Sequence, residues 1–540
     1  MKLFGGAKDG SAAVAKKGQR PEFRYPFVGQ PVPTSWKVVD RYALNAPFAY
    51  AVVAEDTSTS TKKYFLDEIA LQPREGAIYA YLLDTLESEL MVPRSATDPK
   101  QYFREQAKRI ATKYSIRASQ IAWPKILYFA ERDLVGFGVL DGLMRDQNIE
   151  DISADGLGKP LFIYHRKYEN METNLTFKGD TELDNTISRL AHMAGRHIST
   201  AFPIVQGTLP GRHRLSGTFR REISPYGGTF TIRKFREDPI TIIDMINMNV
   251  IDHDLAAYVW LLMENRATAI VAGATGSGKT TLLNALLTLT RVNSKLVTIE
   301  EVQEVNTTHL NWTALVSRES YGASEDMGRE ISLFELVKTA MRMRPDILVV
   351  GEVRGEEAYV LFQAIATGHG GLCTLHADDA SSAIQRLTSK PMDVPAAFIP
   401  FLDLIFTVRR LAIPLPDGSF RTVRRVMSVD EVVSVGNYIR MFRWDPATDK
   451  QVSSPMRTSV KLARLSKDIG LSIAELTDEL AKRAMVLRWI QQKGVRNFRE
   501  LATVLEDYRS DPRNLLEQAS RDLSMFKVTA QADGGSGIQL

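Results

Sequence analysis

The chain has 540 residues, of which 44% are hydrophobic and 24% are charged, and these ordinary globular values exclude a chain that is disordered or fibrous as a whole. At about 100–200 residues per domain, the length predicts two or three domains. A formal net charge of only +4 argues against a dedicated nucleic-acid-binding protein, and the single cysteine, Cys373, excludes an intramolecular disulfide and a cysteine-based zinc site.

The N-terminal sequence carries no targeting signal that we can identify. No stretch approaches the roughly 20 consecutive apolar residues of a membrane span, and the first residues lack the apolar core of a signal peptide, so we expect a cytoplasmic protein. Residues 1–40 are rich in Lys, Arg and Gly, which predicts a flexible basic arm. This arm is either a solvated tail or a dock for anionic lipid or an acidic partner.

The first folded region is expected to be mainly helical. Residues 41–145 alternate apolar clusters with helix-forming runs, of which 75–90 and 101–114 are the clearest. We interpret them as a helical N-terminal region.

A mixed domain and a linker are expected next. From residue 146 to 237, short β-rich runs at 160–164 and 229–233 surround one helix near 182–194, which predicts a mixed α/β N-terminal domain. An Asp-Pro pair then disfavours helical geometry, so we place the interdomain linker at 238–245.

Residues 246–528 show apolar runs of four to six residues alternating with helices, which is typical of a parallel sheet covered on both faces. The clearest strands are 268–272, 296–299 and 347–350. Helical spacing of apolar residues at 473–492 and 498–508 predicts two C-terminal helices. The Gly- and Ser-rich end, residues 529–540, is expected to be a disordered tail.

The strongest local signal is GATGSGKT at residues 273–280, a full match to G-x-x-x-x-G-K-[ST] between an apolar strand and a helix-forming run. Such a loop points backbone N–H groups at phosphate oxygens, while Lys279 neutralises the β- and γ-phosphates and Thr280 holds Mg²⁺. The alternative is an ordinary glycine-rich turn. We predict ATP and Mg²⁺ as cofactors and the following nucleotide-binding residues: Gly273, Ala274, Thr275, Gly276, Ser277, Gly278, Lys279, Thr280 and Thr281.

Acidic residues follow two of the predicted strands, where magnesium and water chemistry needs them. Glu300 is expected to position the attacking water, and its neighbour Glu301 to act as a metal ligand. Glu352 ends an apolar run and resembles the acid of a Walker B strand, orienting the water directly or through the metal. Lys279, Glu300 and Glu352 are therefore the expected catalytic residues, with surface carboxylates as the alternative for either acid.

A second glycine-rich segment, residues 367–377, contains His369 and His376. An imidazole there can donate to a γ-phosphate or couple its loss to a neighbouring segment, so both are predicted phosphate sensors. Metal binding by the two histidines is disfavoured because no third ligand lies nearby in the sequence.

Four motifs occur in one order, namely the phosphate loop and residues 298–304, 341–354 and 367–377. Together they resemble the Walker A, Asp box, Walker B and His box motifs of the type II/IV secretion ATPases. Five upstream segments resemble the archaeal branch, which contains the archaellum motor and archaeal type IV pilus assembly ATPases; they are 149–153, 164–165, 199–203, 211–215 and 229–235. The resemblance covers about residues 130–430.

The sequence departs from this family pattern in three places. Glu301 stands where Asp is common, and Arg342 with Met343 stands where Gly-Arg or Leu-Arg is expected. The cysteine-rich zinc insert of some bacterial relatives is absent from the sequence.

The resemblance implies an α/β fold with a RecA-like P-loop C-terminal domain, a mixed α+β N-terminal domain and a helical N-terminal extension. It also implies a homohexamer that binds nucleotide between the two domains, with arginines of the N-terminal domain reaching the phosphates. By position these arginine donors are Arg212, Arg214 and Arg233. Arg342, Arg344 and Arg354 are expected at the ring interface.

The function implied is a motor that powers assembly or rotation of a type IV pilus-like filament, or a related secretion process. Its expected partners are a polytopic membrane platform protein and an accessory ATPase-like regulator, and its place is the cytoplasm, peripheral to the inner face of the cell membrane. A hexameric P-loop nucleic-acid translocase is the alternative from another class, and a non-hydrolysing, nucleotide-regulated scaffold is a third.

Overall fold

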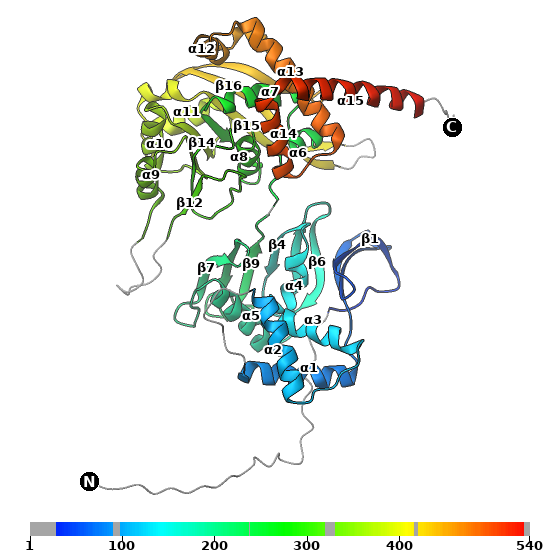
Figure 1. The fold of residues 1–540 in the computed structure, drawn as a ribbon. Coiled ribbons are helices and arrows are strands. Elements are labelled where there is room, and N and C mark those ends of the chain that lie inside the picture. The colour runs from blue at the N-terminus through cyan, green and yellow to red at the C-terminus, as the bar shows by residue number, and fades with distance from the viewer. Residues whose placement is uncertain (1–28, 90–97, 237, 319–329, 415–419, 534–540) are drawn as a thin grey trace, which may run out of the picture. The chain divides into compact units, whose positions relative to one another are not determined.

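Figure 1 shows the computed structural model, which describes residues 29–89, 98–236, 238–318, 330–414 and 420–533. The chain divides into two compact units, with the boundary between Phe235 and Arg236. Most of the expected basic arm, residues 1–28, lies outside the described residues. Within the described ranges, none of the helices combines the length and the apolar character needed to cross a bilayer.

The first unit is built on a nine-stranded sheet with the order β1-β2-β3-β6-β5-β4-β9-β8-β7. All neighbouring strands are antiparallel except β3 and β6, which pair in parallel. The strands are β1 (Trp36–Asn45), β2 (Ala49–Asp56), β3 (Lys62–Glu68), β4 (Ile149–Ala154), β5 (Pro160–His165), β6 (Glu169–Thr176), β7 (Ile204–Leu209), β8 (His213–Thr218) and β9 (Thr229–Arg233).

The described part of the first unit also contains five α-helices: α1 (Pro73–Glu89), α2 (Pro99–Lys113), α3 (Ala122–Leu134), α4 (Asp141–Arg145) and α5 (Asp180–Met193). Helices α1 to α3 share one apolar core, and α5 packs with the sheet in another. The expectation that 41–145 is helical is incomplete, because β1 to β3 occupy the start of this range. Buried Val, Tyr and Phe side chains on β2 and β3 favour strands, and these strands join the sheet of the following domain.

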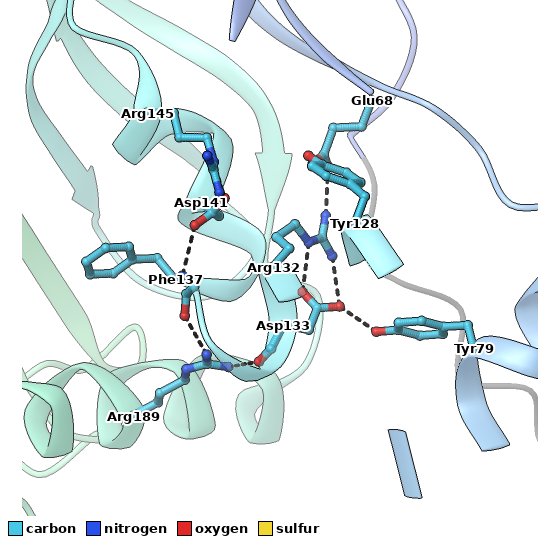
Figure 2. A network of polar contacts seen from close by, with 10 residues as sticks. Glu68, Tyr79, Tyr128, Arg132, Asp133, Phe137, Asp141, Arg145 and Arg189 are labelled. Carbon is cyan, nitrogen blue, oxygen red and sulfur yellow. Dashed lines mark hydrogen bonds and ion pairs between the residues drawn. The ribbon is translucent and has the colours of Figure 1, made fainter. Parts of the chain in front are cut away.

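A buried polar network holds the helices of the first unit to its sheet (Figure 2). The guanidinium of Arg132 on α3 lies 2.8 Å from a carboxylate oxygen of Glu68 on β3 and 2.7 Å from Asp133, and the Arg132 side chain is 1% exposed. Tyr79 on α1 donates to Asp133 at 2.5 Å, and Tyr128 donates to Glu68 at 2.5 Å. The network therefore joins β3, α1 and α3 through the buried ion pair of Arg132 and Glu68 and the partly exposed Asp133.

The second unit contains a nine-stranded sheet with the order β12-β11-β13-β14-β10-β15-β16-β17-β18. The strands from β12 to β15 in this order run parallel, and β16 to β18 continue as antiparallel hairpins. They are β10 (Ala269–Ala272), β11 (Leu296–Glu300), β12 (Trp312–Val316), β13 (Ile347–Val350), β14 (Gly370–Leu375), β15 (Leu404–Pro414), β16 (Phe420–Ser434), β17 (Asn437–Asp445) and β18 (Lys450–Ser453). The three predicted buried strands correspond to β10, β11 and β13.

Helices cover both faces of this parallel sheet, as the apolar runs predicted. One apolar core joins alternate residues of β10 and β13 to α6 (Ile242–Asn247), α7 (His253–Glu264), α8 (Lys279–Leu287) and the C-terminal helices α12 (Val460–Ile469), α13 (Ile473–Lys493), α14 (Phe498–Ser510) and α15 (Pro512–Asp533). The other joins the remaining residues of those strands to α9 (Leu333–Met341), α10 (Glu357–Ala366) and α11 (Ala380–Thr388). The α/β class with a parallel sheet is confirmed.

Two expected boundaries differ from the structure. The range 238–245, expected as a linker, already contains the start of α6, because Thr241 and Asp244 form a reciprocal capping box that begins the helix at Ile242. Residues 529–533 of the expected tail continue α15, and 534–540 lie outside the described residues.

Replacing Arg132 with Met should destabilise the first unit locally by about 3–5 kcal/mol, because Glu68 would remain buried without its cation. We expect hydrogen exchange, followed by mass spectrometry, to accelerate in β3 and α3. The matched control is Arg41→Ala, which removes an ion pair to Asp67 whose side chains are 56% and 47% exposed and should cost about 1 kcal/mol or less. Equal exchange rates in the two variants would contradict the claim that the buried ion pair contributes more stability than the exposed one.

Candidate functional site

The centre of the parallel sheet carries the glycine-rich loop. Strand β10 is buried throughout, and the loop that follows it leads directly into α8 at Lys279. Gly276 and Gly278 have φ values of +73° and +97°, a backbone conformation that side chains disfavour. A Cβ atom on Gly273 would lie 2.5 Å from the carbonyl oxygen of Val408. The glycines are therefore required by the curvature and the close packing of this loop.

The polar groups of this loop suit a polyphosphate. The Ser277 hydroxyl oxygen is buried and makes no hydrogen bond within the described residues. The ammonium group of Lys279 donates to the carbonyl of Ala274 in its own loop at 3.2 Å. Backbone N–H groups of the first turn of α8 have no partner within the helix, and they add the positive end of its dipole. An anion in the loop would thus meet an unused hydroxyl, a cation and free amides.

Burial lowers the pKa of Lys279, and the nearby Glu352 carboxylate opposes that shift. The lysine is 9% exposed, so its charge acts over short distances with little screening by water. Thr280 and Thr281, in the first turn of α8, are half-buried beside it. The predicted nucleotide-binding residues therefore lie together between the end of β10 and the first turn of α8.

The two acids expected to serve catalysis lie at the same carboxyl edge, but in different environments. Glu300 is the last residue of β11 and is buried, and its Oε1 accepts hydrogen bonds from the N–H groups of Glu304 and Val305 at 2.8 and 2.9 Å. This carboxylate holds the backbone of the loop that follows its strand. Glu301 is exposed and lies 3.6 Å from a guanidinium nitrogen of Arg354.

Glu352 follows β13 and is the acid most closely tied to the phosphate loop. Its Oε2 accepts from the Arg354 guanidinium, and its Oε1 lies 2.8 Å from Nε2 of His376, which follows β14. Burial lowers the pKa of His376 and Lys279 lowers it further, while Glu352 acts in the opposite direction. The imidazole and the Glu352 carboxylate are therefore neighbours at the edge of the sheet, although Oε1 of Glu352 accepts no hydrogen bond among the described residues.

The prediction for His369 is wrong. It lies at the amino end of β14, whereas the phosphate loop follows the carboxyl end of the parallel strand β10. Its Nδ1 is 2.9 Å from the carbonyl of Ala364, so the side chain caps the end of α10. A strand of six residues is about 20 Å long, which separates His369 from the phosphate loop.

The three expected arginine donors all belong to the first unit. Arg214 and Arg233 lie opposite each other in the β8–β9 pair, and both line a depression of about 490 Å³ on the sheet. Arg233 also lies 3.3 Å from Asp151. Arg212 sits apart in the preceding turn with φ +65°, and its guanidinium is 5.4 Å from the centre of the Phe235 ring. The structure thus brings together two of the three expected arginine donors, Arg214 and Arg233.

Two arginines at the phosphate site were not predicted to lie there. Arg354, expected at a ring interface, links Glu301 to Glu352. Arg424 on β16 donates to the carbonyl of Gly276 at 3.4 Å across 148 positions of sequence. The motif around Glu352 could have indicated Arg354, but only the strand order reveals Arg424.

A glycine-rich loop of this sequence, at the carboxyl end of a buried parallel strand and leading into a helix, defines a P-loop nucleotide-binding domain. Residues 140–400 match the family described as type II/IV secretion system protein, and residues 11–68 match the family described as PilB3-like, N-terminal. The chain belongs to the type II/IV secretion system protein family, and its second unit has the RecA-like fold expected from the motifs.

Similar proteins come from archaea and bacteria. Uncharacterized protein MJ0900 of Methanocaldococcus jannaschii is 34% identical over 389 residues, which cover 71% of this chain and 69% of that protein. Conjugal transfer protein TrbB of Rhizobium radiobacter is 31% identical over 254 residues, which cover 45% of this chain and 73% of TrbB. The solved structure of the Legionella pneumophila ATPase DotB is similar over 67% of this chain and 93% of its own, with 17% identity and a TM-score of 0.38.

A histidine beside the candidate arginine donors of the first unit allows a prediction of how the stability of that unit depends on pH. His213 lies between two of the candidate arginines, and its Nδ1 accepts the Phe235 N–H at 2.9 Å. Burial, assisted by Lys234, lowers its pKa to about 4. Because the unfolded chain would bind this proton near pH 6.5, His213 should destabilise the folded unit progressively as the pH falls from about 6.5 to 4.

The measurement is an NMR titration of the full chain carrying ¹³C-labelled histidine, with His213→Phe assigning the resonance. The same variant should lose less stability than the wild type over this pH range. A His213 midpoint at or above 6.5 would show that the Nδ1 contact does not hold the ring neutral.

Proposed function

We propose that this chain hydrolyses ATP and uses the loss of the terminal phosphate to drive assembly or rotation of a type IV pilus-like filament. The observation that carries the proposal is the meeting of the phosphate loop, Lys279 and Glu352 at one edge of the sheet. The family match and the conjugal transfer relative support a role in transport across the cell envelope.

The residues of the loop fit a magnesium nucleotide. Lys279, the loop amides and the buried hydroxyl of Ser277 would hold the β- and γ-phosphates. The hydroxyl of Thr280 and the carboxylate of Glu301 are oxygen ligands of the kind Mg²⁺ prefers, and Glu352 can act directly or through a water. When bound, Mg²⁺ supplies neutralisation of charge on the phosphate oxygens.

Glu352 is the better placed of the two acids to orient the attacking water. Arg354 bonds one of its oxygens, and the other, which lies 2.8 Å from Nε2 of His376, accepts no hydrogen bond among the described residues, so it can accept one from a water at the edge next to Lys279. Glu300 instead holds the backbone at Glu304 and Val305, so we assign it the positioning of that loop. Water attack at the γ-phosphorus breaks its bond to the β–γ bridging oxygen and releases ADP and phosphate.

The same proposal includes the assembly around the site. We propose a homohexamer in which Arg214 and Arg233, with Arg212, come from another domain or subunit to stabilise charge in the transition state. The ring would act in the cytoplasm at the inner face of the membrane on a polytopic platform protein, together with an accessory ATPase-like regulator. An archaellum or an archaeal pilus is the filament that the motif pattern favours.

Lys279→Ala should lower the turnover of magnesium-ATP by at least about 10²-fold, because it removes a cation from the charge that develops on the γ-phosphate. The measurement is phosphate release at saturating ATP. Lys450→Ala, which changes an exposed lysine on β18, is the control and should leave turnover unchanged.

Turnover that survived in Lys279→Ala would rule out the assigned phosphate site. In the host, the same variant should fail to restore filaments or secretion after deletion of the gene. Hydrolysis stimulated by DNA, with a steeply salt-dependent affinity, would favour a nucleic-acid translocase instead.

If the arginine donors come from another subunit, specific activity should rise with protein concentration through the range in which subunits associate. Arg214→Ala and Arg233→Ala should each lower kcat by about 10²–10³-fold without preventing nucleotide binding. Arg221→Ala removes an exposed arginine of the same unit, 3.3 Å from Asp180, and serves as the control. Constant specific activity across the association range would contradict a donor in trans.

A further inference from the structure

The carboxyl edge of the parallel sheet has an uneven distribution of charge. On one side of the phosphate loop, Glu300 is the last residue of β11 and Glu352 follows β13. On the other side, β15 and β16 extend past the loop as a hairpin, and they carry Arg410 and Arg424 at opposite positions of the pair. In the strand order, the loop after β10 lies between the strands that end near Glu300 and Glu352 and the strands that carry Arg410 and Arg424.

Arg424 contacts the phosphate loop directly. Its Nε donates to the carbonyl of Gly276 at 3.4 Å, and its Cδ would lie 3.1 Å from a Cβ atom on Gly278. The stem of the arginine therefore packs over one loop glycine while its Nε holds another. The side chain is nevertheless exposed, and none of the ion pairs found among the described residues includes it.

The positions of the acids fix the direction of a bound nucleotide. The γ-phosphate must lie toward Glu352 and Lys279, since the reacting water and the metal need those groups. A triphosphate that begins on the acidic side continues across the loop, so its α-phosphate and nucleoside leave toward β15 and β16. Arg424 packs on the loop from that side. A planar guanidinium stacks on aromatic rings, which a purine base supplies.

Resting on the proposed function, we infer that Arg424 packs against the nucleoside end of the ATP held in the loop of the same chain. It is a nucleotide-binding residue supplied in cis by a strand remote in sequence from the four motifs. The inference adds a contact to the base and sugar, whereas the motifs account for the phosphates and the metal.

Isothermal titration calorimetry of the full chain can separate the two ends of the ligand. In Arg424→Ala, the Kd of magnesium-ADP should rise by about 3- to 30-fold, the range expected for one cation–π contact. The Kd of magnesium tripolyphosphate, which has no nucleoside, should stay within about twofold of the wild type. Arg424→Met, which keeps the stem over Gly278 but lacks the guanidinium, should behave like Arg424→Ala.

Arg421→Ala is the matched control. Arg421 is an exposed arginine three residues away on β16, so it projects from the opposite face of the hairpin, and its loss should change neither Kd.

The other possible outcomes of the calorimetry would contradict the inference in different ways. Equal weakening of both ligands in Arg424→Ala would make the arginine a phosphate contact, and unchanged binding of both would remove it from the site. Weakening of ADP by Arg421→Ala to the same extent would reduce the effect to the general charge of the hairpin. Failure of the wild type to bind either ligand would instead overturn the proposed function.

Discussion

Parallel pairing of the strands from β12 to β15 is the constraint on which the site depends. In a parallel sheet, the carboxyl ends of all strands meet at one edge, so residues distant in sequence become neighbours. Both faces of β10 and β13 are buried beneath helices, which leaves the edge as the place where polar side chains can gather. The loop, Glu300, Glu352 and His376 all lie where a strand ends. The chemistry of the site is thus a consequence of strand direction.

Much of the second unit could be predicted because strands buried on both faces are nearly continuous apolar runs. Such runs stand out from flanking polar sequence, and the phosphate loop follows one of them. His369 and His376 show the limit of this reasoning. The two residues flank the same strand, and their shared glycine-rich surroundings hide the fact that they lie at opposite edges of the sheet. Strand direction, applied to both histidines, would have separated them.

The strands β1 to β3 and Arg424 were missed for a different reason. The first three strands lie in a range otherwise dominated by helices, and their place in the sheet depends on pairing with β6, more than 100 residues later. Arg424 meets Gly276 because β10, β15 and β16 are neighbours, which no local pattern specifies. Long-range register decides both features, whereas local periodicity and composition decide only the elements themselves.

The match of residues 11–68 to a family of its own ends at Glu68, the last residue of β3. That end point is not a structural boundary. Strand β3 pairs with β6 at Lys63 and Tyr64, the Asn174 side chain bonds both backbone groups of Leu66, and Glu68 itself faces Arg132. Removing the segment that ends there would leave β6 as an open edge of the sheet and would take from the buried Arg132 one of its two carboxylate partners. The described part of this matched segment, residues 29–68, therefore belongs to the same folding unit as the strands and helices that follow it.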